Sequence, residues 1–165
     1  MQTRRKLLVA ACLSLLAASA SAQSLDPTRT GLLPVPANRI VGLWHVSVRI
    51  GPCLGGPTQT FLALANYHAG GTLSDANTMP PAARGPGQGI WSFQGRNQYQ
   101  SRFQFYRYLP NGSYDGLQDI QGVLVLDARA THYTQTIHAQ VLNIDGSVRA
   151  DLCGSAAAER VAMTN

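Results

Sequence analysis

The sequence predicts an all-β fold, an antiparallel up-and-down β-barrel of about eight strands that follows a cleavable signal peptide. From residue 40 onward, segments with alternating or β-rich character recur at spacings of roughly 8 to 14 residues. The stretches between them are mostly short and rich in Gly, Asn and Pro. Such short turns favour a meander, because a Greek-key sandwich needs longer crossings between its sheets.

The expected strands follow from the apolar alternation. Residues 40–50 place Trp44, Val46 and Val48 on one face with polar residues between them, the pattern of a half-buried strand. Residues 79–88 contain three prolines, which cannot donate to a strand ladder, so this stretch is expected to be a loop. The other expected strands cover residues 58–68, 72–77, 89–94, 97–109, 117–126 and 132–144, with two short final segments at 147–152 and 156–164.

Residues 1–22 have the order of a secretory signal peptide. Three basic residues at 4–6 precede an apolar stretch that is shorter than the roughly 20 residues of a membrane span, and an Ala-Ser-Ala site ends at Ala22. Cleavage there leaves an arm (23–39) and a barrel domain (40–165) with no transmembrane span. We therefore expect a periplasmic or secreted protein, exported by the general or the twin-arginine route.

The charge of the chain gives no indication of a nucleic-acid partner. The formal net charge is +5, and loss of the three basic residues of the signal peptide lowers it to +2. The ten remaining basic residues are all arginines, scattered from Arg29 to Arg160 without a run. A nucleic-acid-binding domain would concentrate them in a patch or stripe.

Two cysteines remain once Cys12 leaves with the signal peptide. An even pair in an oxidising compartment predicts a disulfide between Cys53 and Cys153, the alternative being two separate thiols. A disulfide needs Cα atoms within about 7 Å, so the first and last strands would be neighbours. Closure of the sheet achieves this and removes the exposed edges that invite aggregation.

The first strand carries the motif Gly42-Leu43-Trp44, which resembles the Gly-x-Trp signature of the calycin superfamily, the lipocalins and their bacterial relatives. The resemblance implies that Trp44 packs across the closed end of a barrel and that an arginine of the last strand, here Arg160, lies against its ring. The chain departs from larger lipocalins in its short first loop (51–57) and in lacking a Thr-Asp-Tyr motif. The layout also resembles the allene oxide cyclase and dirigent type of barrel, some of whose members steer cyclisations.

An aromatic strand supplies the candidate lumen. Tyr99, Phe103 and Phe105 share one parity, and an eight-stranded barrel is just wide enough to be filled by its own side chains or to hold one small ligand. The expected lumen residues are Trp44, Val46, Val48, Tyr99, Phe103, Phe105 and Leu124. A plain filled core is the alternative. The opposite parity carries Gln100, Arg102 and Gln104 and would make the lumen polar if it faced inward.

The sequence singles out no catalytic residue, metal site or cofactor. Neither Cys/His zinc spacing nor a Gly-x-Ser-x-Gly motif occurs, and three of the aspartates lie around turns, where they commonly serve turn geometry. The residues weighed are His45, His68, His132, His138, Asp115, Asp119 and Asp127.

These observations predict an exported barrel that binds a small, partly apolar molecule. One alternative is a cyclase or isomerase that shapes its substrate in the same lumen, marked by an interior acid, histidine or tyrosine with a shifted pKa. Another is a structural or protein-interaction module, which predicts a filled barrel with an apolar patch outside it.

Overall fold

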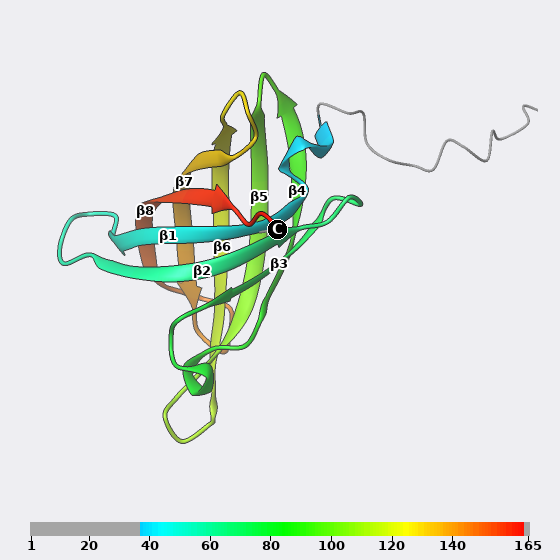
Figure 1. Ribbon diagram of the computed structural model, residues 1–165. Coiled ribbons are helices and arrows are strands. Elements are labelled where there is room, and N and C mark those ends of the chain that lie inside the picture. The colour runs from blue at the N-terminus through cyan, green and yellow to red at the C-terminus, as the bar shows by residue number, and fades with distance from the viewer. Residues whose placement is uncertain (1–36, 164–165) are drawn as a thin grey trace, which may run out of the picture. The chain divides into compact units, whose positions relative to one another are not determined.

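The computed structural model describes residues 37–163, which form a closed antiparallel barrel of eight strands (Figure 1). Each strand pairs with the next along the chain, and the last pairs with the first. The elements are η1 (Ala37–Ile40), β1 (Gly42–Pro52), β2 (Gln59–Tyr67), β3 (Thr72–Asn77), η2 (Pro81–Ala83), β4 (Gly87–Gly95), β5 (Gln98–Tyr108), β6 (Tyr114–Leu126), β7 (His132–Leu142) and β8 (Val148–Arg160). The predicted fold class and meander are confirmed, whereas the predicted signal peptide lies outside the described residues.

The C-terminal end of the barrel differs from the expectation in one respect. The two segments expected at residues 147–152 and 156–164 are a single strand, β8, so Cys153 lies within the last strand and does not precede it. Gly154 lies between the two expected segments and sits opposite Ile50, where β8 passes close to the backbone of β1. A Cβ at residue 154 would collide with the carbonyl oxygen of Arg49, so this glycine permits the close approach.

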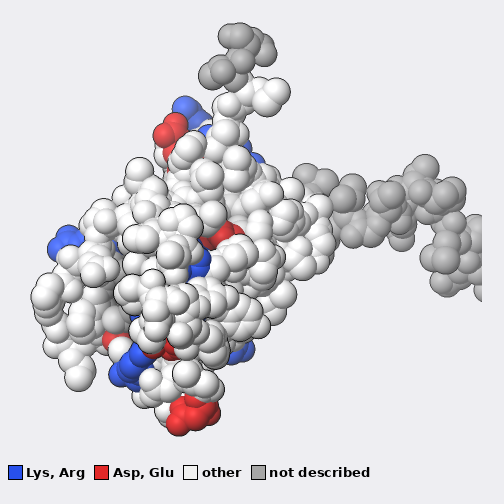
Figure 2. Space-filling model, turned by 90° about the horizontal axis from the view of Figure 1, so that it is seen from below, with Lys and Arg blue, Asp and Glu red and all other residues white. Residues whose placement is uncertain are grey.

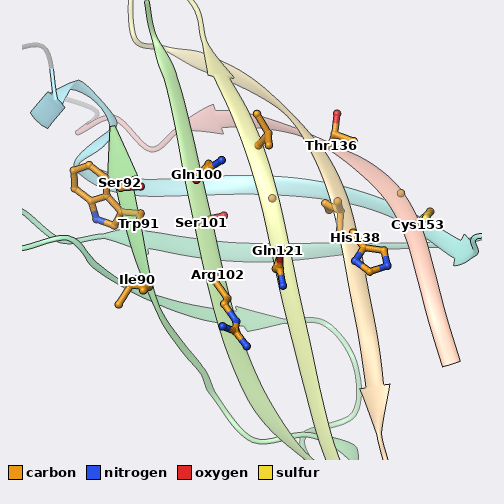
Figure 3. A pocket seen from close by; sticks show the side chains of 14 residues that line it. Ile90, Trp91, Ser92, Gln100, Ser101, Arg102, Gln121, Thr136, His138 and Cys153 are labelled. Carbon is orange, nitrogen blue, oxygen red and sulfur yellow. The ribbon is translucent and has the colours of Figure 1, made fainter. Parts of the chain in front are cut away.

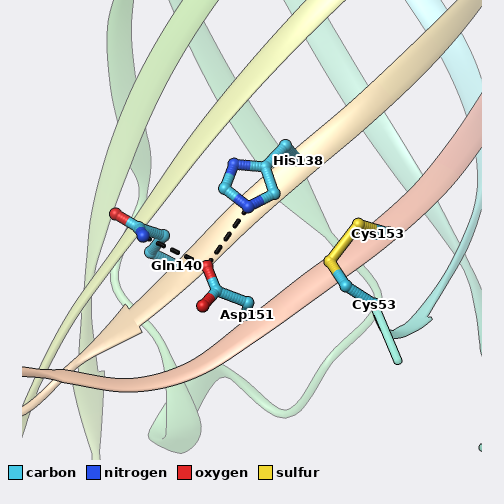
Figure 4. Close-up of a disulfide and its surroundings, with 5 residues drawn as sticks. All are labelled: Cys53, His138, Gln140, Asp151 and Cys153. Carbon is cyan, nitrogen blue, oxygen red and sulfur yellow. Dashed lines mark hydrogen bonds and ion pairs between the residues drawn. A yellow bond between two sulfur atoms is a disulfide. The ribbon is translucent and has the colours of Figure 1, made fainter. Parts of the chain in front are cut away.

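The disulfide between Cys53 and Cys153 is present, with Cα atoms 4.7 Å apart. It joins the loop after β1 to the middle of β8 (Figure 4). A backbone hydrogen bond from Cys53 to the carbonyl of Asp151 supports the same junction. The disulfide therefore ties together the two strands whose pairing closes the barrel.

One end of the barrel is closed by η1 and the side chains beneath it. The Trp44 ring is fully buried and donates from Nε1 to the carbonyl of Ile40 at 2.9 Å. The Arg160 guanidinium lies over this ring, 4.3 Å from its centroid, and donates to the carbonyls of Arg39, Val41 and Ala130. This is the arrangement that the Gly-x-Trp resemblance implies.

Gly42 is required in this arrangement for two reasons. Its φ of +135° is a backbone conformation that residues with a Cβ rarely adopt. A Cβ at residue 42 would also lie 2.6 Å from Nη1 of Arg160. The glycine of the motif thus makes room for the arginine that covers the tryptophan.

Candidate ligand-binding site in the barrel lumen

A cavity of about 200 Å³ lies inside the barrel and is lined by side chains from both walls. Four of the predicted lumen residues, Val46, Val48, Phe103 and Phe105, line it. The other three, Trp44, Tyr99 and Leu124, are completely buried near the closed end and lie outside the wall of the cavity. Of the seven residues expected in the lumen, four therefore line the cavity and three pack at the closed end.

The alternative of a polar lumen built from Gln100, Arg102 and Gln104 is wrong, because this parity faces outward. Arg102 donates from Nε to the Asp119 carboxylate at 3.0 Å, and Gln104 donates to the same carboxylate at 2.8 Å. Burial acts to raise the pKa of Asp119, but the hydrogen bonds from Arg102 and Gln104 outweigh it and the pKa is lowered. On β5, Phe103 and Phe105 thus face inward, whereas Gln100, Arg102 and Gln104 face outward.

A buried ion pair lies in the lumen, and the sequence analysis did not identify it. Arg84, from the proline-containing loop between β3 and β4, donates from Nη2 to Oδ1 of Asp75 on β3 at 2.6 Å. The two side chains are only 5% and 9% exposed, and both line the cavity. The Arg84 guanidinium also lies over the Phe105 ring, 3.8 Å from its centroid.

Arg84 uses only part of its hydrogen-bonding capacity. A guanidinium carries five N–H donors, and within residues 37–163 neither Nε nor Nη1 of Arg84 has an acceptor. Nearly all buried polar groups in folded proteins are paired, because an unpaired one loses its hydration without compensation. The wall of the lumen therefore contains a buried guanidinium with two nitrogens that have no acceptor.

Two tyrosines, Tyr67 and Tyr133, belong to the polar part of the cavity lining. Tyr67 shares hydrogen bonds with Tyr133 and Ser101, and the two tyrosine rings meet edge to face with centroids 6.2 Å apart. Burial raises the pKa of Tyr67 and of Tyr133 far above the ordinary value, so both hydroxyls stay protonated. Burial also raises the pKa of Asp75, and the charge and hydrogen bond of Arg84 offset this only in part.

The raised pKa of Asp75 predicts an unusual dependence of stability on pH. A carboxyl that holds its proton more tightly when folded stabilises the fold below the unfolded pKa of about 3.9, and this contribution is lost as the pH rises through the folded pKa. Urea unfolding from pH 3 to pH 8 measures it. The advantage in unfolding free energy of the wild type over Asp75→Asn should fall as the pH rises from about 4.

Asp119→Asn is the control for this measurement. Because the pKa of Asp119 is lowered in the folded state, its contribution is present above pH 4 and lost as the pH falls below it. The two variants should therefore trend in opposite directions with pH. A wild-type advantage over Asp75→Asn that grows with pH would contradict the assignment.

A larger hollow, of about 600 Å³, lies on the outer face of β4 to β8 and is open to solvent (Figure 3). Two of its polar side chains already have charged partners: Arg102 is bound to Asp119, and His138 lies 3.2 Å from Asp151, which also accepts from Gln140 (Figure 4). The enclosed lumen, with its unpaired donors, is accordingly the better candidate for a ligand site.

Elsewhere in the described part of the chain, charged side chains and histidines do not gather into a second candidate site. In the view from below Figure 1, acidic and basic side chains are interspersed among uncharged ones (Figure 2). Within residues 37–163 no three His, Cys, Asp or Glu side chains gather as a metal site requires. No helix in that part of the chain has the length and apolar character needed to cross a membrane.

No protein-family model and no curated protein sequence matches this chain. Among solved structures, the chain is similar to an S-type phycobiliprotein lyase from Guillardia theta, with 6% sequence identity and a TM-score of 0.42. The match covers 77% of this chain and 91% of the lyase chain. A likeness of this size says nothing about the ligand or the activity of this protein.

Proposed function

We propose that this protein is a small-molecule-binding barrel that takes a partly apolar ligand into its lumen. The observation that carries the proposal is the cavity of about 200 Å³, walled by aromatic and aliphatic side chains and containing a few polar groups. Ligand sites typically combine apolar walls with a few placed polar groups. An apolar cavity of about 150 Å³ can hold benzene, so a ligand with one ring and short substituents fits the size.

The route to the lumen lies at the end opposite η1. There the loop that contains η2 and the end of β5 supply Met79, Ala83, Arg107 and Tyr108 to the cavity wall, and Figure 1 places η2 and η1 at opposite ends of β5. Thr78 at the start of this loop donates to the carbonyl of Leu62 on β2, but residues 79–83 cross the end of the barrel without pairing into the sheet. Its displacement would admit a ligand at little cost in backbone hydrogen bonds.

We further propose that the barrel is calycin-like and works in the periplasm or outside the cell. The contact of Arg160 with Trp44 beneath η1 supports the first part. The signal-like pattern of residues 1–22 and the disulfide support the second, because disulfides persist in oxidising compartments. Mass spectrometry of the protein recovered from the periplasm should find an N-terminus at Gln23, and an intact Met1 would contradict export by cleavage.

A second candidate function, an enzyme that isomerises or cyclises its ligand, is favoured by the acid in the lumen. Asp75 has a raised pKa and faces the same cavity as the protonated hydroxyls of Tyr67 and Tyr133. The two functions can be distinguished with a molecule that co-purifies with the protein. This molecule is isolated and then added to ligand-free protein. An enzyme would convert it, with loss of turnover in Asp75→Asn, whereas a binding protein would release it unchanged.

The binding proposal is tested by titrating toluene into ¹⁵N-labelled protein (residues 23–165) and following amide chemical shifts. Toluene should bind with saturable shifts at residues around the cavity. Ala63→Leu, which adds an isopropyl group inside the lumen, should weaken binding at least about tenfold, the effect of 1.4 kcal/mol. Ala76→Leu makes the same change on the exposed face of β3 and should leave binding unaltered.

The proposal fails if toluene does not bind, which is the outcome expected of a structural module with a filled barrel. It also fails if Ala63→Leu binds toluene as tightly as Ala76→Leu does. In that case the probe occupies an outer surface, such as the hollow of Figure 3, and not the lumen.

A further inference from the structure

The chemical class of the ligand is indicated by the guanidinium groups around the lumen. Three charged side chains line the cavity within the described chain: Asp75, Arg84 and Arg107. The carboxylate nearest to Arg107 is Asp115, 3.6 Å from its Nε, and Arg149 already holds that carboxylate with contacts of 3.0 and 2.9 Å. Arg84 and Arg107 carry two positive charges against the one negative charge of ionised Asp75. The lining of the cavity therefore has a net positive charge.

The free donors of Arg84 are held in place and do not sample solvent. Nη2 is fixed by Asp75, and one face of the guanidinium lies on the Phe105 ring. The side chain is only 5% exposed, so bulk water does not supply the acceptors that Nε and Nη1 lack. Leaving a charged donor unpaired in the interior costs more free energy than leaving a neutral one unpaired.

A purely structural role does not explain this geometry. Buried ion pairs contribute little net stability, and apolar side chains of similar volume are often as good or better. A structural pair would also be expected to have its remaining donors satisfied by neighbouring carbonyls, as those of Arg160 are at the closed end. Arg84 instead has two nitrogens without an acceptor, in the wall of a largely apolar space that is large enough for a ring.

We propose that the lumen binds small apolar carboxylates, with the anionic group accepting hydrogen bonds from Arg84 and the apolar part packed between Phe103, Phe105 and the walls opposite. This inference rests on the proposed binding function and names the ligand class of the same site. Charge-assisted hydrogen bonds to a carboxylate are about twice as strong as neutral ones, and the surrounding low dielectric strengthens them further.

Benzoate and benzamide form a matched pair of probes, because they differ in charge and hardly in shape. The expected result is that the wild-type protein binds benzoate at least about tenfold more tightly than benzamide. The double variant Asp75→Asn/Arg84→Met removes both charges of the buried pair, keeps the net charge and leaves no lone buried ion. It should bind the two probes with equal affinity while still binding toluene.

The matched control is Asp119→Asn/Arg102→Met, the same exchange at the ion pair on the outer face of the barrel. It should retain the full preference for benzoate. Equal affinities of the wild type for benzoate and benzamide, or a preference that survives the loss of Arg84, would overturn the inference. Toluene binding separates this failure from that of the proposed function: toluene would still bind in the first case and would not bind in the second.

Discussion

Replacing Trp44 with alanine is expected to lower the free energy of unfolding by about 3–5 kcal/mol, the cost of removing a large aromatic side chain from a packed core. The ring is 0% exposed, donates to the carbonyl of Ile40 and packs 4.9 Å from the Tyr133 ring. Its removal also takes away the ring on which Arg160 lies, so a half-buried cation loses its cation–π partner. Urea unfolding followed by circular dichroism measures the effect.

Leu43→Ala is the control, because it makes a large-to-small change at the neighbouring position of the same strand. Leu43 is 39% exposed on the outer face, and substitution there should cost about 0.5 kcal/mol. If Trp44→Ala cost no more than Leu43→Ala, the closed end would not be the packed region described above.

Removing the disulfide is the second change with a large expected effect. Cys53 and Cys153 are separated by 100 residues, for which the chain-entropy model gives about 4.7 kcal/mol, and measured losses for native disulfides are typically 2–5 kcal/mol. Cys53→Ala/Cys153→Ala should therefore unfold at a clearly lower urea concentration than the oxidised wild type. Reducing agent should lower the midpoint of the wild type and leave that of the variant unchanged.

Hydrogen exchange locates the effect of this disulfide. Because it ties β1 to β8, its loss should speed amide exchange along the β1–β8 seam more than along β5–β6, which no disulfide joins. A variant that is as stable as the wild type, with an unchanged β1–β8 seam, would show that the pairing of these strands closes the barrel without covalent help.

The strands were predictable because their determinant is local. In β1 and β5 the apolar residues alternate with polar ones, and the pattern alone placed Val46, Val48, Phe103 and Phe105 on the inward face. The prediction failed at β8, where the one strand was expected as two segments separated around Gly154. Whether a glycine interrupts a strand or permits close approach to a neighbour depends on the partner backbone, here that of Arg49, which the local sequence does not specify.

The buried ion pair was not predictable for the same reason. Arg84 lies in a loop with three prolines, where an arginine is ordinarily solvated, and its burial results from the loop folding back over the open end of the barrel. Asp75 did carry a signal, because it alternates with Leu73 on a short strand and therefore shares the inward face. The aspartates singled out by sequence, Asp115 and Asp119, instead bind arginines outside the cavity wall.

A crystal structure of the protein grown with benzoate would show whether the lumen binds a carboxylate, because it locates the ligand. We expect benzoate in the lumen, with a carboxylate oxygen within hydrogen-bonding distance of Arg84 and the ring against Phe103 and Phe105. Benzoate bound only in the hollow on the outer face, above a lumen filled by its own side chains, would contradict it.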